Sequence, residues 1–109
     1  MAFITLYRAV GPAEYADITT TGLLRPGPNS CEGKHFCTSS DDAIVWAKRF
    51  YNNTEAYVIE IEINVRDITY FTKFDQKLDG VGIAFFAGVE ILSACRVVSG
   101  KRVLPERRT

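Results

Sequence analysis

The sequence lacks the features that define several large classes of protein. No apolar run in its 109 residues approaches the roughly 20 residues that span a bilayer, so we expect no membrane association. The first residues show no basic region followed by an apolar stretch, so we expect no signal peptide. The 13 basic side chains balance 13 acidic ones, and the formal net charge is zero. General nucleic-acid binding requires clustered Lys and Arg, so we do not expect it either.

Cysteine and histidine are also scarce. Cys31, Cys37 and Cys95 cannot all pair within one chain, which favours free thiols in a reducing compartment. Cys31, His35 and Cys37 are close in sequence, but structural zinc sites usually have four ligands in two short pairs, so we expect no metal. His35 and Cys37 are spaced to share one face of a strand, yet no third group is identified that would orient the imidazole of a nucleophile pair.

Three motifs of cofactor and metal enzymes are absent: a phosphate loop, a G-x-G-x-x-G turn and an H-E-x-x-H helix. No internal repeat, low-complexity stretch or interior linker divides the chain, so residues 1–109 are expected to form a single domain. Apolar residues make up 47% and charged residues 24% of the sequence, which is ordinary for a globular fold and argues against disorder.

The hydrophobic pattern predicts an α+β domain with few helices. Strands are predicted where β-branched and aromatic residues gather or alternate with polar ones, at residues 3–9, 36–38, 57–64, 67–72, 89–98 and 102–104. In the third of these, one face is apolar and Glu60 and Glu62 face solvent. Residues 25–35 are expected to be irregular, residues 76–88 are punctuated by glycine, and Ser99-Gly100 is expected to form a turn.

Two helices are predicted. The first begins at Pro12 and ends at Gly22, a residue type that favours the C-terminal cap. The second begins after a hydroxyl cap within Thr38-Ser39-Ser40, with Asp41 and Asp42 in its first turn, where carboxylates complement the helix dipole. Its apolar residues recur at helical spacing, at Ala43, Trp46, Ala47 and Phe50.

Three short segments together indicate a function. Tyr7-Arg8 ends the first strand, Phe36-Cys37-Thr38-Ser39-Ser40 runs from a strand into a helix, and Glu90-Ile91-Leu92 lies in a later apolar segment. This order resembles the ADP-ribosyltransferase superfamily in its arginine–serine–glutamate branch. Residues 36–40 match the aromatic-x-Ser-Thr-Ser motif of that branch, with Thr38 in place of the first serine, a substitution that retains the hydroxyl group.

Four further motifs extend the resemblance over roughly residues 5–98. They are Gly27-Pro28-Asn29-Ser30, Glu32-Gly33-Lys34-x-Phe36, Asp41-x-Ala43-x-x-Trp46-Ala47 and Leu78-Asp79-Gly80-Val81-Gly82. These look like the small C-terminal toxin domains of Rhs-type polymorphic toxins, which are thought to be compact members of the same superfamily. The resemblance implies an α+β fold of two small, packed, mostly antiparallel sheets with an NAD cleft between them.

The resemblance also implies an activity and its setting. The domain would be an NAD-dependent ADP-ribosyltransferase toxin, a monomeric secreted effector that acts in the cytoplasm of a competing cell. It would transfer ADP-ribose from NAD to a macromolecular acceptor, expected to be a protein. Its producer would need a cognate immunity protein that plugs the cleft. NAD would be the co-substrate, and no metal would be required.

The residues matched to the family motif receive roles by the same resemblance. Glu90 would stabilise the oxocarbenium-like transition state formed when the nicotinamide–ribose bond breaks. Arg8 would hold a phosphate or the nicotinamide ribose through forked hydrogen bonds. Thr38 would fix the rotamer of Glu90 or Arg8, with Ser39 assisting. Further contacts with NAD are expected from two aromatic residues and two residues of the irregular loop, namely Tyr7, Phe36, Asn29 and Ser30.

Each assignment has a simpler structural interpretation. Arg8 alone is an ordinary surface cation, the hydroxyl run is a helix cap, and Glu90 alternates outward to solvent. Many relatives carry Glu or Gln two residues before the catalytic Glu, where this chain has Gly88, so recognition of an arginine acceptor is in doubt. Three other functions therefore stay open: an NAD glycohydrolase, a non-catalytic binding or immunity module, and a ribonuclease that uses His35 with Lys34, Arg8 and Glu90.

Overall fold

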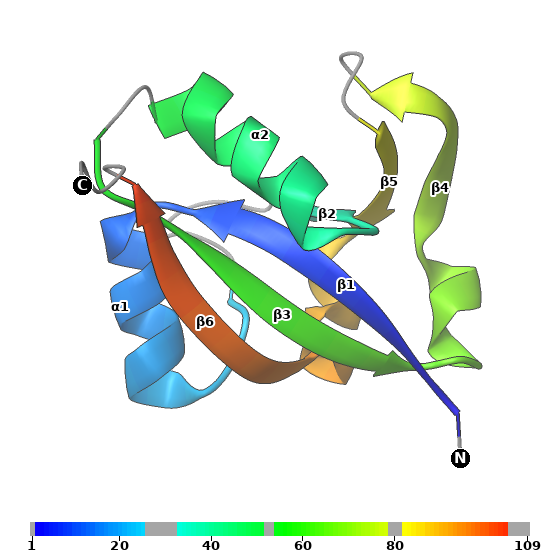
Figure 1. The fold of residues 1–109 in the computed structure, drawn as a ribbon. Coiled ribbons are helices and arrows are strands. Elements are labelled where there is room, and N and C mark those ends of the chain that lie inside the picture. The colour runs from blue at the N-terminus through cyan, green and yellow to red at the C-terminus, as the bar shows by residue number, and fades with distance from the viewer. Residues whose placement is uncertain (1, 26–32, 52–53, 79–81, 105–109) are drawn as a thin grey trace.

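Six strands form one antiparallel sheet in the order β4-β5-β2-β1-β3-β6 (Figure 1). The computed structural model describes residues 2–25, 33–51, 54–78 and 82–104. The strands are β1 Phe3–Val10, β2 Lys34–Cys37, β3 Ala56–Asn64, β4 Thr72–Leu78, β5 Gly82–Ala87 and β6 Arg96–Leu104. The helices of the described residues are the α-helices α1 Pro12–Thr21 and α2 Ser40–Tyr51 and the 3-10 helices η1 Asp67–Tyr70 and η2 Val89–Ala94.

The α+β class is confirmed, but the prediction of two packed sheets is wrong. All six strands belong to one sheet. Its middle is nevertheless weakly joined, because the register between β1 and β2 is defined only at Tyr7 opposite Cys37. By contrast, β1 and β3 pair along their whole length, from Phe3–Asn64 to Val10–Tyr57. The halves β4-β5-β2 and β1-β3-β6 are therefore connected through a short ladder beside Arg8.

Both predicted α-helices form, and their caps follow the sequence. Gly22 ends α1 in the left-handed conformation (φ 73°), and its N–H donates to the Ile18 carbonyl over 2.7 Å. At the start of α2, the Ser39 hydroxyl oxygen accepts a hydrogen bond from the Asp42 N–H at 3.1 Å, which is the N-cap arrangement. Asp41 and Asp42 occupy the first turn of that helix.

The two α-helices cover opposite faces of the sheet. Alternation along β3 sends one set of residues toward α1 and the 3-10 helices, and the other toward α2. The larger core lies on the α1 face and includes Leu6, Val10, Ile18, Phe36, Ile59, Ile61, Ile63 and Leu92. Smaller clusters under α2 contain Cys37, Ala43, Val58, Ala47, Ala56 and Leu104. The predicted apolar face of residues 57–63 is thus confirmed, since Ile59, Ile61 and Ile63 are buried and Tyr57 packs against them.

The second half of the chain departs from the predicted strands. Residues 67–70 and 89–94 form 3-10 helices where the sequence suggested strands. Residues 82–87 form β5, whereas no strand is predicted within the glycine-punctuated residues 76–88. The expected turn at Ser99-Gly100 is wrong as well, since both residues lie within β6.

The glycine at position 100 of β6 leaves space for a neighbouring aromatic ring. A Cβ atom at this position would lie 2.8 Å from the Tyr15 ring. That ring stacks on Tyr57 with centroids 3.8 Å apart, and its hydroxyl donates to the Gly100 carbonyl at 3.4 Å. Glycine here therefore permits the close packing of α1 against β3 and β6 rather than a turn.

Candidate functional site

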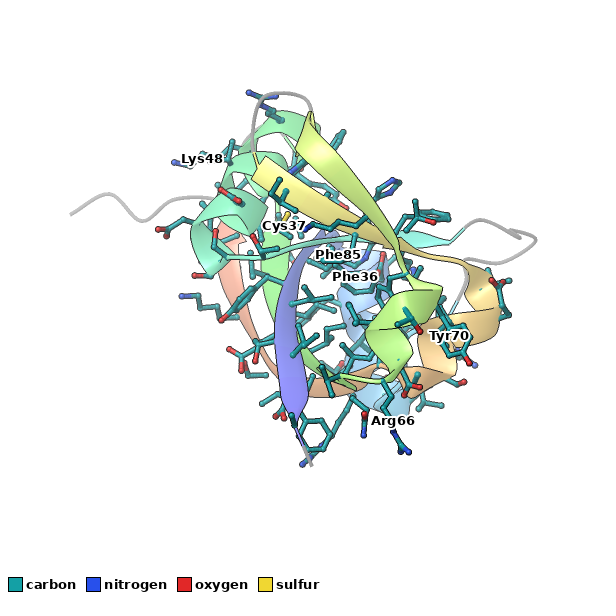
Figure 2. The ribbon with its side chains drawn as sticks, turned by 90° about the vertical axis from the view of Figure 1, so that its right-hand side faces the viewer. Phe36, Cys37, Lys48, Arg66, Tyr70 and Phe85 are labelled. Atoms are coloured by element: carbon teal, nitrogen blue, oxygen red, sulfur yellow. The ribbon has the colours of Figure 1, made fainter. Side chains whose placement is uncertain are left out.

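A pocket of about 350 Å³ lies between α2 and the central strands β1, β2 and β5. Its lining residues are Arg8, Ala9, His35, Phe36, Cys37, Trp46, Phe50, Tyr51 and Ala84. Four of these nine described residues are aromatic, and Arg8 carries the one permanent charge among them. The pocket lies at the short β1–β2 ladder, and Figure 2 shows Phe36 and Cys37 of β2 close to Phe85 of β5 in the upper half of the molecule.

Arg8 is held by two carboxylate oxygens of Glu14. Its Nε donates to Oε2 at 2.8 Å and its Nη2 donates to Oε1 at 3.0 Å, a bidentate arrangement. Lys34 completes the cluster, with Nζ 3.2 Å from Glu14 Oε2. Both residues of the Arg8–Glu14 pair are about four-fifths shielded from solvent, and Lys34 is more deeply buried. The cluster contains two cations and one anion, so its net charge is positive.

Strand alternation explains why this cluster exists. Leu6, Arg8 and Val10 share the face of β1 that meets the larger core, and Glu14 lies in the first turn of α1 on the same side. A charge at the edge of a core requires a partner. Burial alone raises the pKa of the Glu14 carboxyl, but the hydrogen bonds and charges of Arg8 and Lys34 outweigh burial and hold the pKa below its usual value.

Arg8 reaches the pocket as well as the core edge. Its Nη1 donates to the His35 carbonyl at 3.0 Å, where β2 offers an oxygen beside the short ladder. A guanidinium group has five N–H donors. The three bonds to Glu14 and His35 therefore leave two of them for a ligand, as far as the described residues supply acceptors.

The α2 side of the pocket is an aromatic wall. Trp46 and Phe50 lie one helical turn apart, and their rings stack with centroids 4.8 Å apart and planes inclined by 20°. The Phe50 side chain is 64% exposed, so part of its ring surface faces solvent. Tyr51 adds a third ring from the same helix. An exposed face of stacked rings suits a planar ligand.

The titratable groups of the lining other than Arg8 are uncharged at neutral pH. Partial burial and the charge of Arg8 lower the pKa of His35 below its usual value. Burial, with a smaller effect of Asp42, raises the pKa of the Cys37 thiol to about 11. Burial also raises the pKa of the Tyr51 phenol. Arg8 is therefore the one charged side chain among the described lining residues at pH 7.

The residues predicted to surround Arg8 are only partly brought to this pocket. Phe36 lines it, although the ring is fully buried in the core. Tyr7 points to the α2 face and packs on the cluster of Cys37, Ala43 and Val58. Ser39 serves as the helix cap, and Thr38 is exposed between β2 and that cap.

Glu90 lies outside the pocket lining. It is in η2 and not on a strand, and its side chain is exposed. The carboxylate folds back over Gly88, where any Cβ atom would collide with it. Glycine at position 88 thus provides room for the carboxylate of Glu90.

Thr38 and Glu90 lie beyond opposite ends of the β2–β5 ladder. Thr38 directly follows Cys37, the last residue of β2, whereas Glu90 comes after Ala87, the last residue of β5. The strands are antiparallel, and about 10 Å of ladder separates these ends at the usual rise per residue. The sequence suggested a hydrogen bond from Thr38 to Glu90 or Arg8, and the arrangement with Glu90 does not fit this register.

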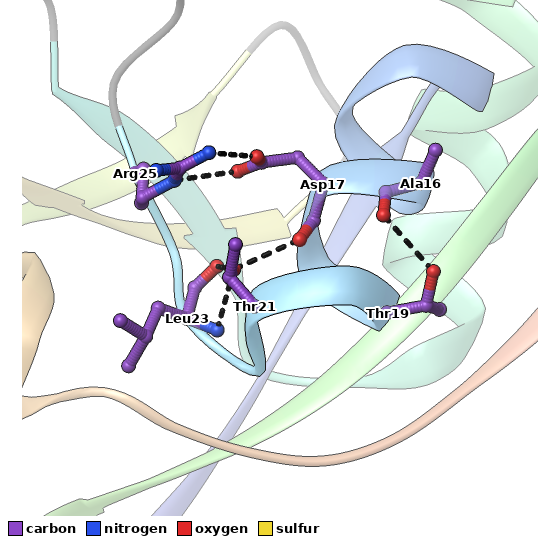
Figure 3. A network of polar contacts seen from close by, with 6 residues as sticks. All are labelled: Ala16, Asp17, Thr19, Thr21, Leu23 and Arg25. Atoms are coloured by element: carbon purple, nitrogen blue, oxygen red, sulfur yellow. Dashed lines mark hydrogen bonds and ion pairs between the residues drawn. The ribbon is translucent and has the colours of Figure 1, made fainter.

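The predicted loop residues Asn29 and Ser30 lie outside the described residues. The chain that leads to them is fixed, as Figure 3 shows. Arg25 Nε donates to Asp17 Oδ2 at 3.1 Å, and Nη2 pairs with the other carboxylate oxygen. The Thr21 hydroxyl donates to the Asp17 carbonyl at 2.8 Å and accepts from the Leu23 N–H at 3.1 Å. The segment after α1 is therefore held against that helix.

Sequence reasoning missed the residues that hold Arg8 and form the aromatic wall. Glu14 was not singled out, although it follows Pro12 in the first helical turn, close to Arg8 in sequence. The sequence gives Lys34 a role only in the resemblance motif and in the ribonuclease alternative, and it predicts Trp46 and Phe50 as apolar residues of a helix face and not as a pocket wall. The available signal was the short distance in sequence between Arg8 and an acidic residue in the first turn of the following helix.

No group of three His, Cys, Asp or Glu side chains among the described residues is arranged to hold a metal ion. No described helix combines the length and apolar character needed to cross a membrane. Comparisons of the chain with protein-family models, with curated proteins and with solved structures give no match. The class of the domain is therefore defined by its own architecture, an α+β fold with one six-stranded antiparallel sheet.

Proposed function

We propose that the domain is an NAD-dependent ADP-ribosyltransferase of the toxin type, acting on a macromolecular acceptor in another cell. The observation that carries the proposal is the strand order β5-β2-β1. The three segments of the family resemblance belong to these neighbouring strands or directly follow them. An aromatic pocket with Arg8 in its lining lies between these strands and α2, and such a pocket suits the ring and phosphate of a dinucleotide.

In the proposed reaction, the bond between nicotinamide and C1′ of its ribose breaks, and nicotinamide leaves with the bonding electrons. The acceptor nucleophile bonds to C1′ and releases its proton. Arg8 binds a phosphate through N–H groups that Glu14 and His35 do not use. Glu90 stabilises the positive charge that develops on the ribose. Because Glu90 is outside the pocket lining, the dinucleotide must extend from the pocket past Lys34, along the β2–β5 ladder.

The test is incubation of the domain with labelled NAD and a bacterial lysate, with Glu90→Gln in parallel. The matched control is Glu62→Gln, which changes a partly exposed carboxylate on β3, away from the pocket lining. We expect a labelled macromolecule with the wild type and Glu62→Gln, and at least about a hundredfold less label with Glu90→Gln, the size of loss expected when a transition-state contact is removed. Free ADP-ribose and nicotinamide without label would indicate a glycohydrolase.

A ribonuclease is the second candidate, because His35 lines the pocket beside Arg8. With its pKa lowered, the imidazole is neutral at pH 7 and can accept a proton. This candidate predicts that His35→Ala abolishes activity, whereas the transferase proposal predicts a modest effect. Intact NAD together with degraded RNA in the lysate would favour the ribonuclease.

A further inference from the structure

The feature that calls for a ligand is the exposed ring stack beside the pocket. Phe50 is 64% exposed while it contacts Trp46, so one large aromatic surface faces solvent at the pocket. Base–aromatic stacking is a strong and sequence-tolerant contact in nucleotide recognition. A flat heteroaromatic ring would cover this surface with little cost in side-chain entropy, because the two rings already stack on each other.

The polar side of the same pocket selects the charge of the ligand. Arg8 contributes a guanidinium group with two N–H donors left over by its bonds to Glu14 and His35. Lys34 contacts the same Glu14 oxygen as the Arg8 Nε and adds to the positive potential. Among the described lining residues there is no carboxylate. An anion is therefore favoured near Arg8, and a cationic ring such as the nicotinamide of NAD is disfavoured there.

The volume limits how much of a dinucleotide fits. Ligand pockets commonly measure about 300–1,000 Å³. At about 350 Å³, this pocket is at the small end of that range. It therefore suits a mononucleotide-sized unit, and the remainder of a dinucleotide would lie outside.

From these observations we infer that the pocket binds an adenylate unit, with the adenine ring on the Trp46–Phe50 stack and the phosphate on Arg8. This inference rests on the proposed function for its biological setting, where the adenylate is the AMP half of NAD. The nicotinamide half then extends outside the pocket, past the end of β2 and toward Glu90 in η2. That direction brings the reacting ribose toward Glu90 and away from the positive charge of Arg8.

Trp46 is the only tryptophan in the sequence, so its fluorescence reports binding without any need for activity. The titration compares AMP with adenosine, which lacks the phosphate, and with nicotinamide mononucleotide, which carries the cationic ring. We expect AMP to quench Trp46 and to bind about tenfold more tightly than either of the other two. Equal binding of adenosine, tighter binding of nicotinamide mononucleotide, or no response to AMP would overturn the inference.

A pair of variants tests the ring contact. Phe50→Ala removes an exposed side chain and is expected to weaken AMP binding about tenfold. Tyr70→Ala is the matched control, because Tyr70 is 69% exposed and lies in η1, well separated from Cys37 in Figure 2. Unchanged AMP binding by Phe50→Ala, or equal loss in both variants, would overturn the assigned role of the ring stack.

The outcome separates this inference from the proposed function. AMP binding with the expected variant pattern, but no cleavage of NAD, would leave the adenylate pocket standing and remove the transferase. Cleavage of NAD without quenching of Trp46 by AMP would support the proposed NAD-dependent activity and overturn the adenylate pocket. The fluorescence titration and the labelling assay therefore fail independently.

Discussion

The Ser39 hydroxyl oxygen accepts a hydrogen bond from the backbone N–H of Asp42, at 3.1 Å. One lone pair of this oxygen is thus committed to the first turn of α2, the helix that carries Trp46 and Phe50. The residue that family resemblance assigns to NAD therefore also fixes the start of the helix beside the pocket. A substitution at Ser39 therefore alters the start of a helix that lines the pocket, whether or not the hydroxyl contacts a ligand.

Two substitutions separate these roles of Ser39. We expect Ser39→Ala to lower the free energy of unfolding by about 1 kcal/mol, the usual cost of losing an N-cap. Ser39→Asp restores a capping oxygen and should recover wild-type stability in urea denaturation. If only capping matters, NAD turnover recovers with Ser39→Asp as well. Full stability with lost turnover in Ser39→Asp would contradict a role of Ser39 in capping alone.

Glu14→Gln removes the anion shared by Arg8 and Lys34. We expect a loss of about 2 kcal/mol at pH 7, because two partly buried cations then face each other without a counter-charge. Urea denaturation of the wild type and the variant gives this value. Asp17→Asn is the matched comparison, because the more exposed Asp17–Arg25 pair should contribute much less to stability. An equal loss in the two variants would contradict the special role of the Glu14 cluster.

The difference in unfolding free energy between the wild type and Glu14→Gln should also depend on pH. The pKa of Glu14 is lower in the folded chain than its ordinary value of 4.5, so its ionisation stabilises the fold above that pH. This contribution is lost as the pH falls through the folded-state pKa. The difference in unfolding free energy between wild type and Glu14→Gln should therefore narrow below pH 4.5. A difference that stays constant down to about pH 3 would contradict the ionised pair.

Gly22→Ala tests the end of α1. The left-handed backbone at Gly22 (φ 73°) disfavours any residue with a Cβ atom, and nothing nearby would contact the added methyl group. We expect a loss of about 1 kcal/mol from backbone strain alone. Thermal unfolding should show a lowered midpoint, with AMP binding unchanged because Gly22 is outside the pocket lining.

Thiol reactivity gives an independent measure of the pocket. Burial raises the pKa of both Cys37 and Cys95 from an ordinary value of 9.0 to about 11, so at pH 8 each should react about a hundredfold more slowly than an ordinary thiol. Cys37 lines the pocket and Cys95 does not. In a Cys31→Ser background, AMP should slow alkylation of Cys37 further and leave Cys95 unchanged, as mass spectrometry of the labelled peptides would show. Equal protection of both thiols would point to global stabilisation instead of pocket binding.

The first half of the fold could be predicted because its signals are local. Pro12 and Gly22 bound α1, Ser39 caps α2, and alternation along residues 57–63 defines the buried face of β3. The second half depends on distant contacts. Residues 89–94 have a strand-like composition, but Leu92 is buried in the larger core from a 3-10 helix, and no local pattern distinguishes the two outcomes.

The candidate site was predictable only in part for the same reason. Arg8 stood out because it ends an apolar strand, yet its partner Glu14 belongs to the next element, and their pairing depends on how α1 packs on the sheet. Glu90 was placed on a strand, and the register that sets it apart from Thr38 is a property of the β2–β5 ladder. Which residues line a pocket depends on such tertiary contacts, and a single sequence does not show them.

The position of β1 in the middle of the sheet affects how fast the chain folds. This strand is formed by the first residues of the chain, yet it pairs with β3, whose residues follow about fifty to sixty positions later, and β3 in turn pairs with the last strand. Chains dominated by such distant pairings must close large loops and fold in about milliseconds to seconds, more slowly than helical bundles. The pocket can therefore form only after residues as distant in sequence as Arg8 and Ala84 have come together.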